Sequence, residues 1–154
     1  RRSLDYLWQG IGAYIACHPQ VRYLFGPVSL SGLLPGQAKA LLVKFYASHY
    51  SDPEHLAEGR QPFCSLPQHR LFAEQLIPGL DRDSEFSNLR KQLDYLGVKI
   101  PTLYKQYADI CEQGGVCFSA FNVDPDFNYC IDGLVSVDLN LLRESKRERY
   151  IKNN

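Results

Sequence analysis

The sequence of 154 residues contains no methionine, not even at its first position. It opens with RRSLDYLWQG, a stretch that already has the apolar spacing of a helix. We therefore expect the chain to be the C-terminal part of a longer protein. Its length suffices for one domain with a hydrophobic core and is too short to suggest two, so residues 1–154 are expected to form a single domain.

A net charge and a long apolar run are also absent. Lys plus Arg and Asp plus Glu each number 17, so no general field favours nucleic acid. No run approaches the ~18 apolar residues of a membrane span, and the first residues of this sequence lack the apolar core expected of a signal peptide. The five scattered cysteines without a CxxC pair are typical of free thiols in a reducing compartment. We expect a soluble, cytoplasmic domain, at most peripheral to the inner membrane.

Common active-site motifs are missing as well, including GxSxG, the P-loop, HExxH and GxGxxG. Asp124, Asp126 and Asn128 alternate like the first ligands of an EF-hand calcium loop. That loop requires glycine at its sixth position and glutamate at its twelfth, where this chain has Tyr129 and Val135. The histidines also lack metal-ligand spacing, so we expect no metal site.

The apolar residues that are present recur with helical spacing over 3–18, 38–49, 86–96 and 101–114. Strands are predicted at 21–30, 116–121 and 131–139. The first has two apolar faces and is expected to be buried and central, whereas the other two should form an antiparallel pair. The turn-rich stretch 51–86 has no periodicity that fixes its form, and the basic end RESKRERYIKNN is expected to be a solvated tail. The pattern predicts an α/β fold.

Glycines interrupt two of these elements. Gly10 and Gly12 lie inside the first helix at a cost of about 1 kcal/mol each. Either close packing of the helix on a sheet or approach of its backbone to a ligand would explain them, and both explanations stay open. Gly26 precedes Pro27 in the first strand and predicts a bulge or a splayed strand.

A few charged residues stand among apolar ones. Arg60 in AEGRQPF could steer an anionic group or form a loop salt bridge. Lys105 lies in the first turns of a helix, where a cation gains nothing from the helix dipole, which favours a functional or packing role. Arg1 and Arg2 precede a helix start, whose free N–H groups bind anions such as phosphate.

Three segments resemble one known family. LWQGIGAYIACHPQVRYLFGPVSL, LGVKIPTLYKQY and FNVDPDFNYCIDGLVSVDL are similar, in matching order and over nearly the whole chain, to segments of GNAT-fold N-acyltransferases of the ornithine-lipid-forming type. These proteins are often labelled hemolysins and are distantly similar to acyl-homoserine-lactone synthases. The resemblance implies an α/β fold with a GNAT-like mixed sheet flanked by helices, seen here as a C-terminal part that lacks the first strands.

The resemblance implies transfer of an acyl group from acyl-CoA or acyl carrier protein to an amine-bearing, lipid-related acceptor, without a permanently bound cofactor. The amine attacks the thioester carbonyl while a backbone N–H stabilises the oxyanion. Arg1, Arg2 and Ser3 would receive the pyrophosphate of the donor, and a splay at Gly26 would admit its pantetheine arm. The logic of this reaction makes Lys105, Asp124 and Asp126 catalytic candidates and Arg60 and Asn128 substrate-binding candidates, and Tyr46 is the candidate for the acid that the family places in the second helix.

Two other functions are compatible with parts of this pattern. The chain could be a non-catalytic docking or dimerisation module beside an upstream acyltransferase domain, so whether it is itself an enzyme stays open. A membrane-lysing protein, as the hemolysin label suggests, is opposed by the lack of a spanning helix or a long cationic amphipathic segment. For Asp126 and Asn128, a simple turn between two strands is an equally good explanation.

Overall fold

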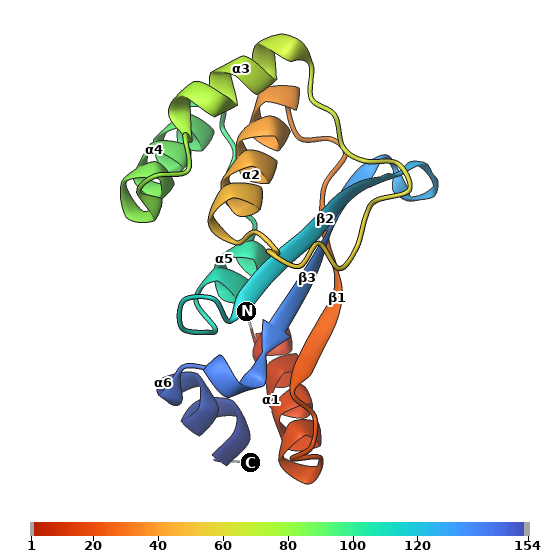
Figure 1. Cartoon of the computed structure of the whole chain (residues 1–154), viewed down its shortest axis with the longest axis vertical. Coiled ribbons are helices and arrows are strands. Elements are labelled where there is room, and N and C mark those ends of the chain that lie inside the picture. Colours follow the sequence, from red (N-terminus) through yellow and green to blue (C-terminus); the bar gives the residue numbers. More distant parts are fainter. Residues whose placement is uncertain (1, 153–154) are drawn as a thin grey trace.

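A computed structural model describes residues 2–152, with side chains from Asp5 onward. Figure 1 shows a narrow sheet with helices along its length. The sheet has three strands in the order β1-β3-β2, and both pairings are antiparallel. An isolated parallel bridge joins Ser51 to Phe118. The strands are β1 (Tyr23–Leu30), β2 (Val116–Asp124) and β3 (Cys130–Asp138).

The helices confirm most of the predicted elements. They are α1 (Arg2–Cys17), α2 (Gly36–His49), α3 (Pro67–Leu76), α4 (Arg82–Tyr95), α5 (Thr102–Ala108), α6 (Glu144–Arg147), the short 3-10 helices η1 (Pro125–Phe127) and η2 (Leu139–Leu141), and the π-helical η3 (Glu148–Lys152). The expected α/β fold, a sheet flanked by helices, is therefore confirmed. No described helix is long and apolar enough to cross a membrane.

Helix α5 ends well before the predicted boundary at Gly114. Beyond Ala108 the backbone forms hydrogen bonds with the C-terminal segment instead of continuing the helix. The N–H of Glu112 donates to the carbonyl of Leu141 at 2.8 Å, and the N–H of Arg143 donates to the carbonyl of Ile110 at 3.1 Å. Hydrogen bonds to the C-terminal segment thus replace those that would have continued the helix.

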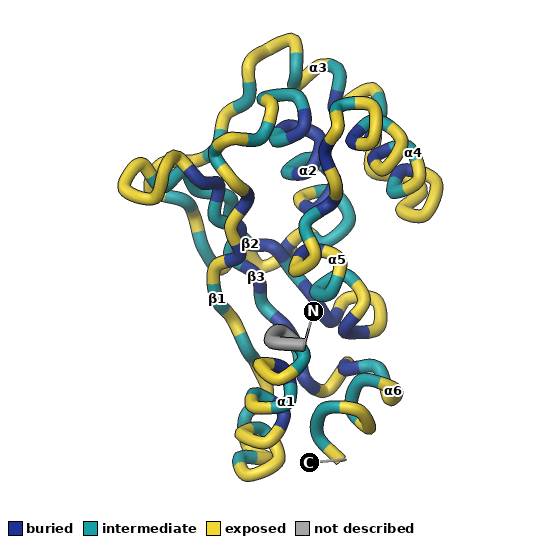
Figure 2. Tube along the Cα trace, turned by 180° about the vertical axis from the view of Figure 1, so that it is seen from behind, coloured by how far each residue is buried: buried dark blue, intermediate teal, exposed yellow. Residues whose placement is uncertain are grey.

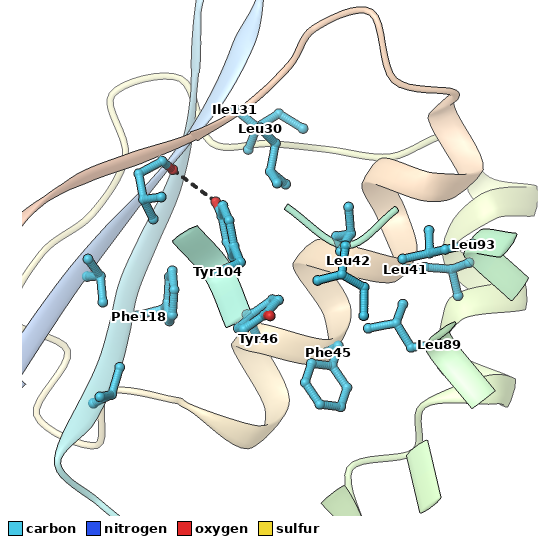
Figure 3. Close-up of a cluster of buried hydrophobic side chains, with 14 of the residues drawn as sticks. Leu30, Leu41, Leu42, Phe45, Tyr46, Leu89, Leu93, Tyr104, Phe118 and Ile131 are labelled. Atoms are coloured by element: carbon cyan, nitrogen blue, oxygen red, sulfur yellow. Dashed lines mark hydrogen bonds between the residues drawn. The ribbon is translucent and has the colours of Figure 1, made fainter. Parts of the chain in front are cut away.

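The hydrophobic core lies between the helices and the sheet (Figure 2). Its largest fully buried side chains come from α2, α4, α5, β1 and β3, among them Tyr46, Tyr104, Phe45, Leu41, Leu42, Leu89, Leu93, Leu30 and Ile131. Figure 3 shows the rings of Tyr46, Tyr104 and Phe118 gathered into one aromatic group, in which Tyr104 and Phe118 stack and Tyr46 packs at an angle to both. This group fixes α2 and α5 against the sheet.

The prediction of a buried central strand at 21–30 is wrong for the described sheet, because β1 lies at its edge and β3 is central. Only Val28 and Leu30 of β1 are buried, and the outward Phe25 is 80% exposed. Pairing with β3 runs without a shift from Tyr23 to Leu30, so at Gly26 the strand β1 has neither the expected bulge nor a splay from β3. The irregularity lies instead in β2, between Phe118 and Ala120. Proline is tolerated in an edge strand, where fewer ladder bonds depend on it.

The basic C-terminal stretch is not a solvated tail. It forms α6 and η3, and α1 packs chiefly against η3. A Cβ on Gly12 would lie 1.7 Å from the carbonyl oxygen of Tyr150, so only glycine permits this close contact. The expected close packing therefore exists for Gly12, but its partner is the C-terminal segment and not the sheet.

Candidate functional site

An apolar cavity of about 570 Å³ lies between α1, β1, β3 and the C-terminal segment. Its inner wall consists of buried side chains, including Ile110, Val135, Val137, Leu139 and Leu142. Its outer wall carries Gly10, Leu24, Phe25 and Gly26. The cavity was not foreseen, since its walls come from four distant stretches of sequence. The only local signal was a glycine among the apolar residues of α1.

Trp8 forms part of the wall of this cavity and is held in place by polar and aromatic contacts. Its Nε1 donates a hydrogen bond of 3.0 Å to Oε1 of Gln106. Its ring meets the edge of Tyr107 at a centroid distance of 5.7 Å and lies 6.1 Å from that of Tyr150. The indole therefore connects α1 with α5 and with η3.

Lys105 lies in a second hollow, a groove of about 520 Å³ between α5, α4 and α6. Arg82, Arg143 and Lys146 line the same groove. Asp109 binds both Arg143 and Lys146, at 2.9 Å and 3.0 Å. Lys105 is exposed and forms no ion pair within the described part of the chain. Asp83, which pairs with Arg82 at 3.0 Å, also lines the groove, so its four cations exceed its two carboxylates and the groove could receive an anionic group.

Asp124, Asp126 and Asn128 lie together at the turn between β2 and β3. Oδ1 of Asp124 accepts hydrogen bonds from the backbone N–H of Asp126 at 2.9 Å and of Phe127 at 3.2 Å. Asn128 and Tyr129 adopt left-handed backbone angles, with φ of 51° and 53°. Asp124 is thus a turn cap, whereas the side chain of Asp126 is exposed and available to a ligand.

Arg60 lies near the same end of the hairpin. The loop that carries it runs along the end of β2: the N–H of Gln61 donates to Oδ1 of Asn122 at 2.7 Å, and its carbonyl accepts from Val123 at 2.8 Å. Arg60 itself is exposed. Figures 1 and 2 both show the hairpin turn well apart from α5. The structure therefore gathers Arg60 with the acidic turn and separates both from Lys105.

Tyr46 is completely buried, and its hydroxyl is a buried side-chain atom without a hydrogen-bond partner in the described structure. Burial, together with Tyr50 and Tyr104 nearby, raises the pKa of Tyr46 far above its usual range. Proton transfer by Tyr46 would require the core to open, and its catalytic role stays a prediction.

The predicted donor-binding residues fall partly beyond the structural description. Arg1 lies outside the described residues, as do the side chains of Arg2 and Ser3, although the backbone of both belongs to α1. Gly26 is in the wall of the apolar cavity, where a Cβ would meet nothing within 4 Å. Gly26 belongs to β1, whose outer edge pairs with no other strand of the described sheet, which is compatible with contact to a donor.

The described thiols with resolved pKa shifts are not activated. Burial raises the pKa of Cys111 to about 11, and burial also raises the pKa of Cys117. Both are therefore protonated at neutral pH, which argues against a role as nucleophile. Among the described residues, no group of three or more His, Cys, Asp and Glu side chains could hold a metal ion.

Sequence reasoning also missed a buried polar pair. Nε2 of His49 lies 2.7 Å from Oε2 of Glu85, and both side chains are less than 10% exposed. The carboxylate also accepts from the backbone N–H groups of residues 79–81. Burial alone would raise the pKa of Glu85, but these N–H groups and His49 outweigh burial and lower it. The pair ties the end of α2 to the start of α4.

Two curated proteins are similar to this chain over nearly its whole length. Both are named glycine N(alpha)-acyltransferase. The protein of Phocaeicola vulgatus is 24% identical over 150 residues, which cover 97% of this chain and 45% of that protein. The protein of Bacteroides thetaiotaomicron is 24% identical over 153 residues, which cover 97% of this chain and 44% of that protein. The chain thus spans somewhat less than half the length of these relatives.

No protein-family model matches the chain, and no solved structure gives a significant match. The similarity to the two named proteins supports the acyltransferase relationship expected from the sequence. Neither name refers to ornithine lipids or hemolysins, so that finer assignment is not supported by these relatives.

Proposed function

We propose that this chain is part of an N-acyltransferase that transfers an acyl group from a thioester donor to the amine of glycine. The similarity to two glycine N(alpha)-acyltransferases over 97% of the chain carries the proposal. The donor is acyl-CoA or acyl carrier protein, and the product is an N-acyl amino acid that serves lipid metabolism. Ornithine, the acceptor implied by the sequence resemblance to the hemolysin-labelled family, is the competing substrate.

The chemistry requires a base for the amine and a cation for the acceptor carboxylate. The end of the β2–β3 hairpin offers both, with the exposed carboxylate of Asp126 and the guanidinium of Arg60. The deprotonated amine attacks the thioester carbonyl, the C–N bond forms, and the C–S bond breaks as the leaving thiolate takes up a proton. Lys105 lies in a groove separate from this end of the hairpin and is assigned to an anionic part of the donor.

To test this, the protein is incubated with either palmitoyl-CoA or palmitoyl-acyl carrier protein as donor and with either glycine or ornithine as acceptor. Mass spectrometry detects the N-acyl product, and a thiol reagent measures the released thiol. Formation of N-palmitoylglycine supports the proposal. Faster acylation of ornithine than of glycine would show that ornithine is the acceptor instead. Thiol release without an N-acyl product would identify a thioesterase and contradict the proposal.

The alternative, a non-catalytic docking or dimerisation module, predicts a different outcome. In that case, neither this chain nor a longer protein that carries it forms an N-acyl product. A longer protein that becomes inactive when residues of this chain are deleted, and recovers when the chain is added separately, would instead place an essential part of the enzyme here. Size-exclusion chromatography with light scattering tests dimerisation directly.

A further inference from the structure

Asn122 holds the loop that carries Arg60 against the outer edge of β2. Its Oδ1 accepts a hydrogen bond of 2.7 Å from the backbone N–H of Gln61, and its Nδ2 donates one of 2.9 Å to the carbonyl oxygen of Val123. Both ends of the side-chain amide are therefore in use. The exchanged orientation would place the NH2 group against an N–H and the oxygen against a carbonyl, so this contact fixes the amide in one orientation.

Backbone hydrogen bonds on either side of Asn122 extend the attachment of the loop. The N–H of Phe63 donates to the carbonyl of Phe121 at 2.9 Å, and the N–H of Val123 donates to the carbonyl of Gln61 at 2.8 Å. An antiparallel bridge joins the loop to β2 here, and Figure 1 shows the loop beside the hairpin end. The segment 61–63 thus lies along β2 like a short additional strand.

The residue before Arg60 is also close to Asn122. A Cβ on Gly59 would lie 3.2 Å from Oδ1 of Asn122, so the backbone of Gly59 runs next to this side chain. Arg60 stands between two residues that contact Asn122, while its own side chain is exposed. The backbone of Arg60 is therefore held in place, and its guanidinium extends from a fixed point.

Asn122 also belongs to the strand that leads into the acidic turn. Asp124, which caps η1, follows two residues later, and Asp126 lies within η1. One side chain thus connects the cation and the carboxylate that the proposed reaction assigns to the two ends of the acceptor. The order of the loop matters because a mobile cation loses conformational freedom when it binds a carboxylate, which weakens binding.

We propose that Asn122 is a positioning residue for acceptor binding, because it orders residues 59–63 so that Arg60 meets the acceptor carboxylate beside the acidic turn. The proposal rests on the glycine acylation proposed above and adds a residue that acts only through Arg60. A contact to the carboxylate is present in the ground state and in the transition state alike. Loss of its position should therefore raise the KM for glycine and leave kcat nearly unchanged.

The first measurement requires no catalysis. Hydrogen–deuterium exchange followed by mass spectrometry measures the protection of the loop amides. In Asn122→Ala, exchange over residues 59–63 should become about tenfold faster or more, while the Tm falls by only about 2–4 °C. Asn140→Ala is the matched control, because Asn140 is exposed on η2, beyond the opposite end of β3. Unchanged exchange in Asn122→Ala, or an equal change in Asn140→Ala, would overturn the proposal.

The kinetics of glycine acylation test the effect on the acceptor. Asn122→Ala should raise the KM for glycine about tenfold, with kcat within about twofold of the wild-type value. Arg60→Ala should raise the KM at least as much. In the Arg60→Ala background, Asn122→Ala should change the KM by less than about twofold, because both substitutions remove the same contact. Two effects on KM that multiply in the double variant, or a decrease in kcat alone, would contradict a role through Arg60.

The outcomes distinguish this proposal from the proposed function. Faster loop exchange with an unchanged KM in Asn122→Ala would retain glycine acylation and overturn the positioning role. If the wild-type protein does not acylate glycine at all, the proposed function fails and the positioning role fails with it. The exchange experiment would then still decide whether Asn122 orders the loop.

Discussion

The hydroxyl of Tyr104 donates a hydrogen bond of 2.9 Å to the carbonyl oxygen of Val28, joining α5 to β1 through the core (Figure 3). Both residues are buried, so the carbonyl has no access to water if the donor is removed. Tyr104→Phe should therefore lower the free energy of unfolding by about 1–3 kcal/mol. Urea denaturation at neutral pH measures this difference, and an unchanged midpoint would show that the bond contributes nothing.

Tyr46 provides the opposite case in the same aromatic group, because its buried hydroxyl has no partner among the described residues. Tyr46→Phe removes an unsatisfied polar group and keeps the ring. We expect unchanged stability or a gain of up to about 1 kcal/mol in the same urea experiment. If transfer to glycine also survives, the predicted role of Tyr46 as an acid is wrong; a large loss of turnover with full stability would support it.

The buried carboxylate of Glu85 predicts a pH dependence of stability. Its pKa is lowered from the ordinary value of 4.5, so its stabilising effect is present above that value and is lost as the pH falls through the folded-state pKa. Glu85→Gln should cost about 1.5–3 kcal/mol at pH 7, and less at low pH. Urea denaturation at neutral and acidic pH tests this, with Glu74→Gln, an exposed position on α3, as the control.

Replacement by alanine should have opposite effects on the stability of the protein at Gly10 and at Gly12. Gly10→Ala adds a methyl group in open space on a helix, which should stabilise the protein by up to about 1 kcal/mol. Gly12→Ala forces the carbonyl of Tyr150 away and should destabilise it by about 1–3 kcal/mol, although alanine favours helices. Thermal unfolding monitored by circular dichroism compares the two. A stabilised Gly12→Ala variant would contradict the observed contact.

In the acidic turn, Asp124 has a structural role as a cap, whereas Asp126 is the proposed catalytic base. Asp124→Ala removes the acceptor for two backbone N–H groups and should cost about 1 kcal/mol, as loss of a helix cap does. Asp126→Ala should leave stability unchanged and lower transfer to glycine at least tenfold if Asp126 is the base. Chemical denaturation and product formation are measured on both. If Asp126→Ala leaves transfer to glycine unchanged, the loop is simply a turn.

Regular elements were predictable where one apolar stripe faces the core. The helices α2 and α4 follow such a stripe, and β3 alternates buried and half-exposed residues as predicted. Helix α3 was missed because Ala73 alone is fully buried among its residues, which leaves little periodicity. Strand β1 was misplaced because Tyr23 and Phe25 face outward, and an apolar side chain does not reveal what covers it.

The candidate site was less predictable, because it depends on which segments meet. The sequence indicated polar candidates as unusual residues, but it gave no sign that Arg60 lies beside the hairpin turn or that Lys105 lines a separate groove. A turn between the two strands was one of two explanations left open for Asp126 and Asn128, and the capping hydrogen bonds of Asp124 show that such a turn is present. The apolar cavity required the path of the C-terminal segment, for which the sequence offered only a basic tail.

The contact between Gly12 and Tyr150 implies an order in which α1 and the C-terminal segment fold during synthesis. Helix α1 leaves the ribosome before the rest of the region, yet its main packing partner, η3, is made last. Until η3 emerges, α1 lacks the neighbour that positions it, and an isolated helix of this length is marginal in water. The sheet and the α2–α5 core can therefore form first, and the wall around Trp8 closes only when synthesis of this region is complete.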